Sequence, residues 1–426
     1  MGVLRTVGVA LALGLGLGLG LGLAAASAVP GMATAAGGHP SGLTYAALGD
    51  SYASGLGLPP YTNQPATGCF QSAANYAHTV ASEWELQLSD ASCSGAVAAN
   101  IVRAPQETGE GTAPPQSTAL SSDTDVVTVS IGGNDLGFAA IAEYCTALSA
   151  EGPITGDLQL DDCRSHFHPD AGTDLLQQRL TEVVEPAVHS ALGGIAAAAP
   201  HAVVIVVGYP AITPDAAHTP AGGCFRSAVK AGSDSGRFAE NAFPFTDADV
   251  PYLHGVEAGL SAMLKRQAEA AGALYIDAFD ASQAHSACAA ASEAYVNGIT
   301  LRDLGGSTAT PAPVPGSGAG APAEFDVERG ALHPNTAGVA FLATQVQTAM
   351  KAAFPAPTPT VSTPGPSPAA DARSEWTLPL TFSPGTVIGI MVVLVATGAV
   401  VTVLWRRRQQ EQDDMARDGE SGSDRR

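Results

Sequence analysis

The strongest constraint on the fold is an alternation of short apolar runs with longer helical patterns. Runs rich in apolar and β-branched residues occur at five places, the second being the weakest: 43–50, 84–93, 125–133, 202–210 and 273–279. Continuous apolar runs of this length are typical of strands buried on both faces. Helical periodicity separates them, notably in 175–199 and 256–272. The alternation predicts an α/β fold with a parallel sheet and helices on both sides.

Length and charge narrow the range of functions. The chain has 426 residues, of which 46% are hydrophobic, and its formal net charge is −21. This length is enough for one large or two modest domains with a substantial core. Binding to phosphates requires clustered Lys and Arg, which the body of the chain does not have. The charge therefore argues against a nucleic-acid partner.

Two apolar segments near the ends predict export and membrane anchoring. The first follows Arg5 and ends at Ala26-Ser27-Ala28, a small-residue cleavage site of the kind found after signal peptides. The second, near 385–405, has about 20 residues without a charge, and three arginines follow it. By the positive-inside tendency the tail after it is cytoplasmic and the preceding chain is extracellular. A buried core helix is the alternative for this second segment.

These segments suggest a division of the chain into five parts. We expect a single-pass protein of the cell membrane whose folded domain lies outside the cell. The parts are a signal peptide (1–28), a folded domain (41–354), a Pro-rich extracellular linker (355–383), a transmembrane helix (384–405) and a cytoplasmic tail (406–426). Within the domain, the Pro/Gly/Ala-rich segment 305–322 is expected to be a loop, either an inert insertion or a lid.

The cysteines indicate an oxidising compartment. They are six in number and all lie in the part expected to be exported: Cys69, Cys93, Cys145, Cys163, Cys224 and Cys288. An even number in an exported protein predicts three disulfides. Six cysteines permit fifteen connectivities, and pairing neighbours along the chain closes the shortest loops. A zinc site is the competing interpretation, although no Cys-x-x-Cys occurs.

Polar residues follow two of the expected strands where each strand ends. Ser51 follows the first strand in "LGDSYASG", and Asn134 follows another in "VSIGGNDLGF". The carboxyl ends of parallel strands form the edge where open α/β sheets bind ligands. A serine there can act as a nucleophile, and an asparagine amide can donate a hydrogen bond to a developing oxyanion. The alternatives are a helix cap for Ser51 and an Asx turn for Asn134.

Four motifs in order resemble the blocks of the SGNH/GDSL hydrolase superfamily. "GDSYASG" resembles the serine block, with Ser51 as nucleophile and its backbone N–H as an oxyanion donor. "CSGA" resembles the glycine block through the backbone N–H of Gly95, and "GGND" the asparagine block through Asn134. "HPNTAG" resembles the histidine block, with His333 as the base. The cysteine spacing is also similar to secreted actinobacterial esterases and lipases of this superfamily, in which neighbouring cysteines pair.

The resemblance carries several expectations. It implies a flavodoxin-like three-layer α/β/α sandwich with a mainly five-stranded parallel sheet over 41–354. It also implies hydrolysis of small-molecule or lipid carboxylic esters without a metal or organic cofactor. We expect a monomer. Removal of acyl groups from envelope polysaccharide or lipid is a second possible activity, and a catalytically inactive surface-binding module is a third.

One residue departs from the family pattern. The commonest form has an Asp three residues before the histidine, where it accepts the Nδ1–H and stabilises the imidazolium. Here that position is Gly330, while Asp326 and Glu328 lie seven and five residues before His333. Some members of the subgroup use a backbone carbonyl instead. We therefore expect the Gly330 carbonyl to orient His333, with Asp326 or Glu328 as the alternatives.

A second His-Pro pair occurs in the sequence, but it does not fit the histidine block. In "HFHPDAG", the side chains of His166, His168 and Asp170 could in principle bind a metal. The spacing offers no further obvious ligand, so a solvent-exposed loop is the better interpretation. By contrast, a proline follows His333 at the expected start of an amphipathic helix, which makes that boundary credible.

Overall fold

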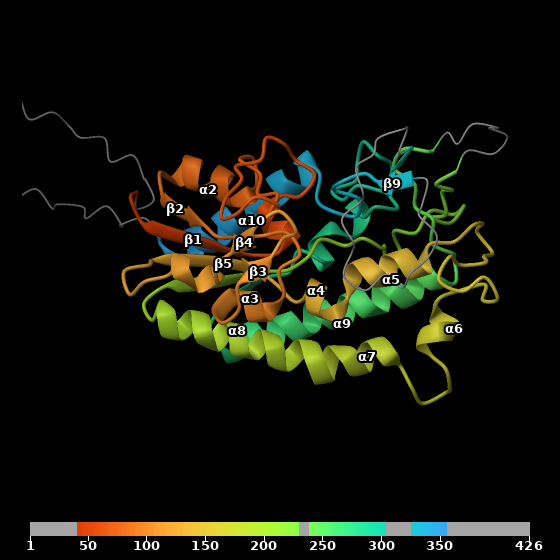
Figure 1. Ribbon diagram of the computed structural model, residues 1–426, viewed down its shortest axis with the longest axis horizontal. Helices are drawn as coiled ribbons and strands as arrows, with labels where there is room; N and C mark the ends of the chain where they lie inside the picture. The colour runs from red at the N-terminus through yellow and green to blue at the C-terminus, as the bar shows by residue number, and fades with distance from the viewer. Residues whose placement is uncertain (1–40, 230–237, 304–324, 356–426) are drawn as a thin grey trace, which may run out of the picture. The chain divides into compact units, whose positions relative to one another are not determined.

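The computed structural model describes residues 41–229, 238–303 and 325–355 (Figure 1). The predicted signal peptide, 305–322 loop, transmembrane helix and cytoplasmic tail lie outside these residues, as does nearly all of the predicted linker. Among the helices of the described residues, none is both long and apolar enough to cross a membrane.

A five-stranded parallel sheet forms the centre of the domain. Its order is β2-β1-β5-β6-β7, and every neighbouring pair of strands is parallel. Each strand lies within one of the five apolar runs, so the predicted strands and the predicted fold class are confirmed. The strands are β1 (Thr44–Gly49), β2 (Gln87–Asp90), β5 (Val126–Ser130), β6 (Val203–Val207) and β7 (Leu274–Ile276).

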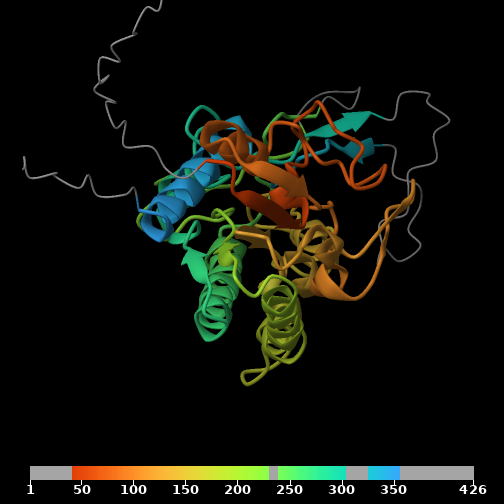
Figure 2. The same ribbon diagram turned by 90° about the vertical axis from the view of Figure 1, so that its left-hand side faces the viewer.

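Helices cover both faces of the sheet and complete the three layers (Figures 1 and 2). One face packs against α2 (Tyr76–Trp84) and α10 (Thr336–Ala353). The other packs against α3 (Ala98–Val102), α8 (Glu185–Ala198) and α9 (Asp249–Ala270). Because successive strand residues point to opposite faces, the inner strands β1, β5 and β6 contribute to two separate cores.

The first strand illustrates this division. Tyr45 and Ala47 belong to the core with α2 and α10, whereas Ala46 and Leu48 belong to the core with α3, α8 and α9. All four side chains are at most 1% exposed. A strand buried on both faces has no polar alternation, which is why β1 is a continuous apolar run in the sequence.

The predicted helix over 175–199 consists of three consecutive segments. These are α7 (Leu175–Arg179), a π-helical turn η2 (Leu180–Val184) and α8. Pro186 lies in the first turn of α8 and has no backbone N–H to donate to the carbonyl four residues earlier. The interruption of the α-helical hydrogen bonds therefore coincides with this proline, and π-turns of this kind interrupt otherwise regular helices.

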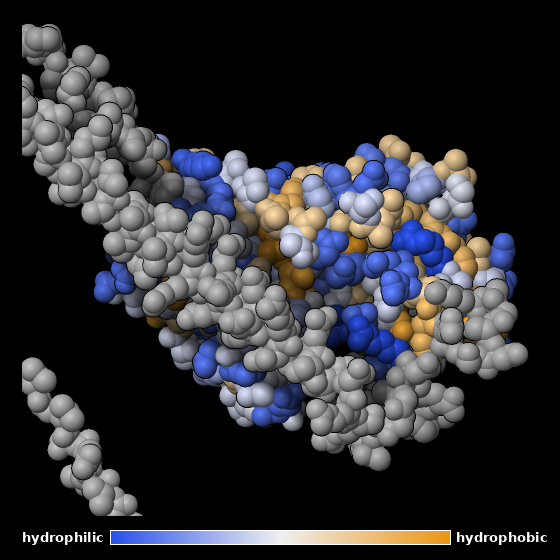
Figure 3. Space-filling model, turned by 90° about the horizontal axis from the view of Figure 1, so that it is seen from above, coloured by the Kyte–Doolittle hydropathy of each residue, from blue (hydrophilic) through white to orange (hydrophobic). Residues whose placement is uncertain are grey.

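The shorter elements lie mainly in the connections around the edge of the sheet where the strands end. They are α1 (Ser51–Ser54), β3 (Gln106–Glu107), β4 (Thr112–Ala113), η1 (Gln116–Ala119), α4 (Gly133–Leu136), α5 (Phe138–Cys145), α6 (Arg164–Phe167), η3 (Asp280–His285), β8 (Leu301–Asp303) and β9 (Phe325–Val327). Seen from above, the surface has apolar residues near the middle of the face and strongly polar ones beside them (Figure 3).

Three disulfides hold the long connections, and each joins neighbouring cysteines as predicted. The pairs are Cys69–Cys93, Cys145–Cys163 and Cys224–Cys288. Cys69–Cys93 lies in a small cluster of its own, and the other two pairs belong to a further apolar core with Phe243 and Phe245. In the chain-entropy model each cross-link stabilises the fold by roughly 3 to 4 kcal/mol. The zinc interpretation is wrong, because every cysteine is paired.

Candidate active site

Ser51 lies on a sharp turn between β1 and α1. Gly49 has φ +132°, and a Cβ there would lie 2.3 Å from the carbonyl oxygen of Ser130 on β5. Only glycine allows this close approach. The Asp50 carboxylate then caps α1 by accepting the N–H of Tyr52 at 3.0 Å. The turn places Ser51 at the carboxyl edge of the sheet, and the predicted cap role belongs to Asp50.

His333 lies within hydrogen-bond distance of Ser51. Its Nε2 is 2.7 Å from the Ser51 Oγ, although the two residues are 282 positions apart. Asn335 caps α10 by accepting the N–H of Gly338 at 3.0 Å, so His333 lies just before the helix. The Tyr52 ring packs against the imidazole with 4.8 Å between ring centroids. The first and last elements of the domain therefore meet at this pair.

The partner of Nδ1 differs from the prediction. His333 Nδ1 lies 2.7 Å from the carbonyl oxygen of Ala331, two residues before it. The Gly330 carbonyl instead accepts the backbone N–H of His333 at 3.1 Å and the side-chain amide of Asn297 at 3.1 Å. The expected kind of acceptor, a backbone carbonyl, is therefore present one residue later than predicted. Because a carbonyl only accepts, Nδ1 carries the hydrogen and Nε2 is free to accept from Ser51.

The backbone conformation explains this one-residue shift. Leu332 has φ +58°, in the left-handed region, which turns the peptide group between Ala331 and Leu332. The Tyr52 hydroxyl donates to the Leu332 carbonyl at 2.6 Å, and the backbone of Asn297 pairs with both Leu332 and His333. These bonds hold the loop in a conformation that a leucine adopts only at a cost.

The structure also shows why an acid is missing at position 330. Gly330 has φ +95°, and a Cβ there would lie 2.7 Å from the Cα of Gly57. Two backbones touch at this point, so position 330 has no room for a carboxylate side chain. The alternatives are contradicted too: the Glu328 carboxylate pairs with Arg302, and Asp326 is exposed on β9. Neither of them occupies the position beside Nδ1 that Ala331 fills.

Burial determines the protonation state of the histidine. It lowers the pKa of His333 to about 4, and the hydrogen bond to the Ala331 carbonyl opposes part of this shift. No carboxylate accepts the Nδ1–H, so the charged form has only a neutral partner. The imidazole is consequently neutral at pH 7 and can accept a proton.

Two further predicted site residues lie in segments beside the turn around Ser51. Asn134 is in α4, and its side-chain amide donates to the Ala96 carbonyl at 2.9 Å, which fixes the amide plane and leaves its second hydrogen. Gly95, with φ +84°, is exposed in the adjoining loop. The neighbouring Ser94 hydroxyl lies 2.8 Å from that of Ser54 in α1. The loop around Gly95 is thus joined by hydrogen bonds both to Asn134 in α4 and to α1.

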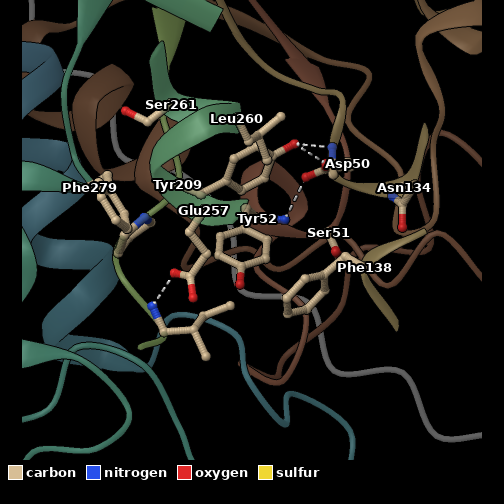
Figure 4. Close-up of a pocket in the computed structure, with 13 residues that line it drawn as sticks. Asp50, Ser51, Tyr52, Asn134, Phe138, Tyr209, Glu257, Leu260, Ser261 and Phe279 are labelled. Carbon is tan, nitrogen blue, oxygen red and sulfur yellow. Dashed lines mark hydrogen bonds between the residues drawn. The ribbon is translucent and has the colours of Figure 1, made fainter. Parts of the chain in front are cut away.

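A tyrosine that the sequence analysis did not select connects the serine and asparagine loops. The Tyr209 hydroxyl donates to the Asp50 carboxylate at 2.6 Å and lies 3.0 Å from the N–H of Gly133, from which it accepts (Figure 4). Burial raises the pKa of Asp50 to about 7, while its hydrogen bonds oppose the rise. Tyr209 follows β6 in "GYP", so its place at the same sheet edge was the available signal.

A small pocket opens beside Ser51. Ser51, Asn134 and Phe138 line it together with Tyr209 and residues of α9, and its volume is about 40 Å³ (Figure 4). Most of the lining side chains away from Ser51 are apolar or aromatic. Such a pocket suits the uncharged part of a small substrate.

The histidines of the second His-Pro motif lie outside the candidate active site. His166 is in the short helix α6, which the loop prediction missed, and the His168 Nε2 is 3.2 Å from the Asp174 carboxylate. Asp170 is exposed. Within the described part of the chain, no three His, Cys, Asp or Glu side chains gather in an arrangement suited to a metal ion.

Comparison with known proteins identifies the family. Residues 47–341 match the model of the GDSL-like lipase/acylhydrolase family, which is more than half of the chain. The chain belongs to this family. As a GDSL-type lipase/acylhydrolase it is a hydrolase of ester bonds.

This GDSL hydrolase is similar to several Streptomyces proteins. It is 36% identical over 249 residues to Lipase 2 of Streptomyces coelicolor, a match that covers 58% of this chain and 74% of the relative. It is 29% identical over 280 residues to an esterase of Streptomyces scabiei, covering 61% of this chain and 77% of the relative. The extracellular lipase of Streptomyces rimosus, a solved structure, aligns with a TM-score of 0.48 and 20% identity over 72% of this chain and 99% of its own.

Proposed function

We propose that the protein is an extracellular serine ester hydrolase that uses a Ser51–His333 dyad. The observation that carries this proposal is the 2.7 Å distance between Ser51 Oγ and His333 Nε2, with Nδ1 held by a carbonyl. In the proposed reaction, Oγ attacks the ester carbonyl carbon while its proton passes to Nε2. The carbonyl π electrons move onto oxygen, which produces a tetrahedral oxyanion.

The oxyanion is bound by three donors in this mechanism: the backbone N–H groups of Ser51 and Gly95 and the side-chain amide of Asn134. The intermediate then collapses, the bond to the alkoxy group breaks, and the imidazolium protonates the departing alcohol. Water repeats the sequence on the acyl-enzyme, with His333 first taking its proton and then returning one to Ser51. The Ala331 carbonyl orients the ring throughout but adds no negative charge.

Labelling and substitution test this mechanism directly. A fluorophosphonate probe should modify Ser51 in the ectodomain and abolish hydrolysis of p-nitrophenyl acetate. Ser51→Ala should neither react with the probe nor hydrolyse the ester. If Ser51→Ala kept the activity of the native protein, Ser51 would not be the nucleophile.

We also propose that the hydrolase domain is anchored outside the cell by the apolar segment 384–405. The support is the charge-free stretch of that segment and the arginines that follow it. A domain in this position would meet esters of the cell envelope. Fractionation of cells that express the full chain, followed by protease treatment of intact cells, tests the orientation: the domain should be in the membrane fraction and be digested from outside.

A further inference from the structure

The pocket beside Ser51 adjoins a second, more apolar one. We call the first the near chamber and the second the far chamber. The two share Phe138, Ile212, Glu257 and Leu260 in their linings. The far chamber has a volume of about 50 Å³, and its other lining residues are almost all apolar, among them Ile141, Ala142, Phe245, Leu253 and Val256. A chain leaving Ser51 through the near chamber therefore meets these four shared residues before the far chamber.

Glu257 is the only acid among the lining residues of the far chamber, and it lies where the two chambers adjoin. One carboxylate oxygen accepts the N–H of Ile212 at 2.8 Å. The other accepts the N–H of Thr213 at 3.1 Å and the Thr213 hydroxyl. In the view of Figure 4, the Tyr52 ring lies between Ser51 and Glu257. Its hydrogen bonds therefore fix the carboxylate in place at the boundary that the two chambers share.

The near chamber is placed to receive the acyl part of an ester. Ser51 and Asn134 line it, whereas His333 does not. In the proposed reaction His333 protonates the leaving oxygen, so the alcohol part lies on the imidazole side. The acyl chain, attached to the carbon that Ser51 attacks, is left to enter the near chamber.

The size of the near chamber limits that chain. A cavity needs roughly 10 to 15 Å³ of volume open to a water-sized sphere for each group of that size. The near chamber, with about 40 Å³, therefore holds roughly three such groups. Three groups beyond the carbonyl carbon correspond to a butanoyl chain of about four carbons. A longer chain has to pass Glu257, where burial raises the pKa of the carboxyl to about 7, so that it stays polar in either protonation state.

We propose that Glu257 limits the acyl chain of the substrate to about four carbons by closing the near chamber with a polar group. This inference rests on the proposed function and specifies its substrate class as esters of short carboxylic acids. Glu257 acts on specificity in this proposal and takes no part in bond making.

The test compares p-nitrophenyl butanoate with p-nitrophenyl hexanoate in the native ectodomain and in Glu257→Ala. Substitution by alanine removes the carboxylate and opens the far chamber. Each methylene transferred from water to an apolar site improves kcat/KM by roughly fourfold. Hexanoate has two more methylenes than butanoate, so the hexanoate-to-butanoate ratio of kcat/KM should rise about fifteenfold in Glu257→Ala. A ratio within one sample is unaffected by any loss of active protein.

Two further variants sharpen the result. Glu269→Ala, an exposed acid on the same helix, should leave the ratio unchanged. Adding Ala142→Phe, which fills the far chamber, to Glu257→Ala should cancel this gain of about fifteenfold. An unchanged ratio in Glu257→Ala, or a native protein that hydrolyses the hexanoate or longer esters better than the butanoate, would overturn the proposal.

A measurement on the native protein covers the case in which Glu257→Ala does not fold. p-Nitrophenyl alkylphosphonates carry an alkyl chain on phosphorus in place of the acyl chain. Because phosphorus takes the place of the carbonyl carbon, the rate of inactivation should fall once the alkyl chain exceeds about three carbons. A rate that kept rising with chain length would refute the limit. Complete failure to inactivate with any chain length would instead refute the proposed function, because no serine would have reacted.

Discussion

The contact between Gly330 and Gly57 makes a strong prediction about the missing acid. Replacing Gly330 by alanine introduces a Cβ that would lie 2.7 Å from the Gly57 Cα, at a residue with φ +95°. The left-handed conformation costs a non-glycine residue about 1 to 2 kcal/mol. Forcing the two backbones apart adds about 1 to 3 kcal/mol, as in other overpacked sites. Gly330→Ala should therefore lower the free energy of unfolding by about 2 to 5 kcal/mol.

The chain provides a matched control for this substitution. Gly272 also has a positive φ, +71°, but a Cβ there would have no neighbour within 4 Å. Gly272→Ala should consequently cost only the conformational part, about 1 to 2 kcal/mol. Urea unfolding of both variants measures the two free energies, and their difference isolates the contact with Gly57.

Activity should respond in the same direction. The loop from Gly330 to His333 carries both the Ala331 carbonyl and the base, and a displacement of about 1 Å in an active site costs about a hundredfold in rate. We expect kcat to fall by about that factor in Gly330→Ala and also in Gly330→Asp, which restores the acid found elsewhere in the family. If Gly330→Asp were as stable as the native protein and more active, our explanation for the absent acid would be refuted.

Three other predictions concern the remaining site residues. With p-nitrophenyl butanoate as substrate, Asn134→Ala should lower kcat by about 10²- to 10³-fold, while the unfolding midpoint should change little. An unchanged kcat would show that Asn134 is not part of the oxyanion hole. Burial lowers the pKa of His333 to about 4, and only the neutral ring accepts a proton. The value of kcat/KM should therefore rise as the pH passes through about 4 and should already be level between about pH 5 and pH 6. A rise centred near pH 6.5 would contradict the effect of burial. Tyr209→Phe removes the hydroxyl that joins Asp50 to Gly133, so kcat should fall by about tenfold with KM unchanged. The control variant Tyr144→Phe, on α5, should leave both kcat and KM unchanged.

Most of the fold could be predicted because the sheet is buried on both faces. The inner strands β1, β5 and β6 had to be continuous apolar runs, whereas the edge strand β2 alternates and gave the weakest signal. The parallel direction of the strands follows from the helices between the runs. The interruptions and the short helices could not be predicted from the sequence. The π-turn before Pro186 and the short helix α6 depend on local backbone geometry rather than on hydrophobic periodicity.

The site was predictable where a side chain carries the chemistry, and less so where the backbone does. The motifs indicated Ser51, Asn134 and His333, and the structure brings Ser51 and His333 into contact. The carbonyl beside Nδ1 belongs to Ala331 because Leu332 adopts a left-handed conformation, which no residue type at that position signals. Glu257 was missed because it belongs to a helical pattern whose sequence gives no sign of the pocket.

The long separation between Ser51 and His333 has a consequence for biosynthesis. A growing chain presents Ser51, its turn and the first strand early, yet the proposed base His333 comes 282 residues later, just before α10. Chains are made from the N-terminus, at roughly 5 to 20 residues per second. A nascent or truncated chain that ends before β9 therefore contains the proposed nucleophile without anything to activate it. In the proposed mechanism, hydrolysis therefore begins only after the chain from β9 to α10 has joined the rest of the domain.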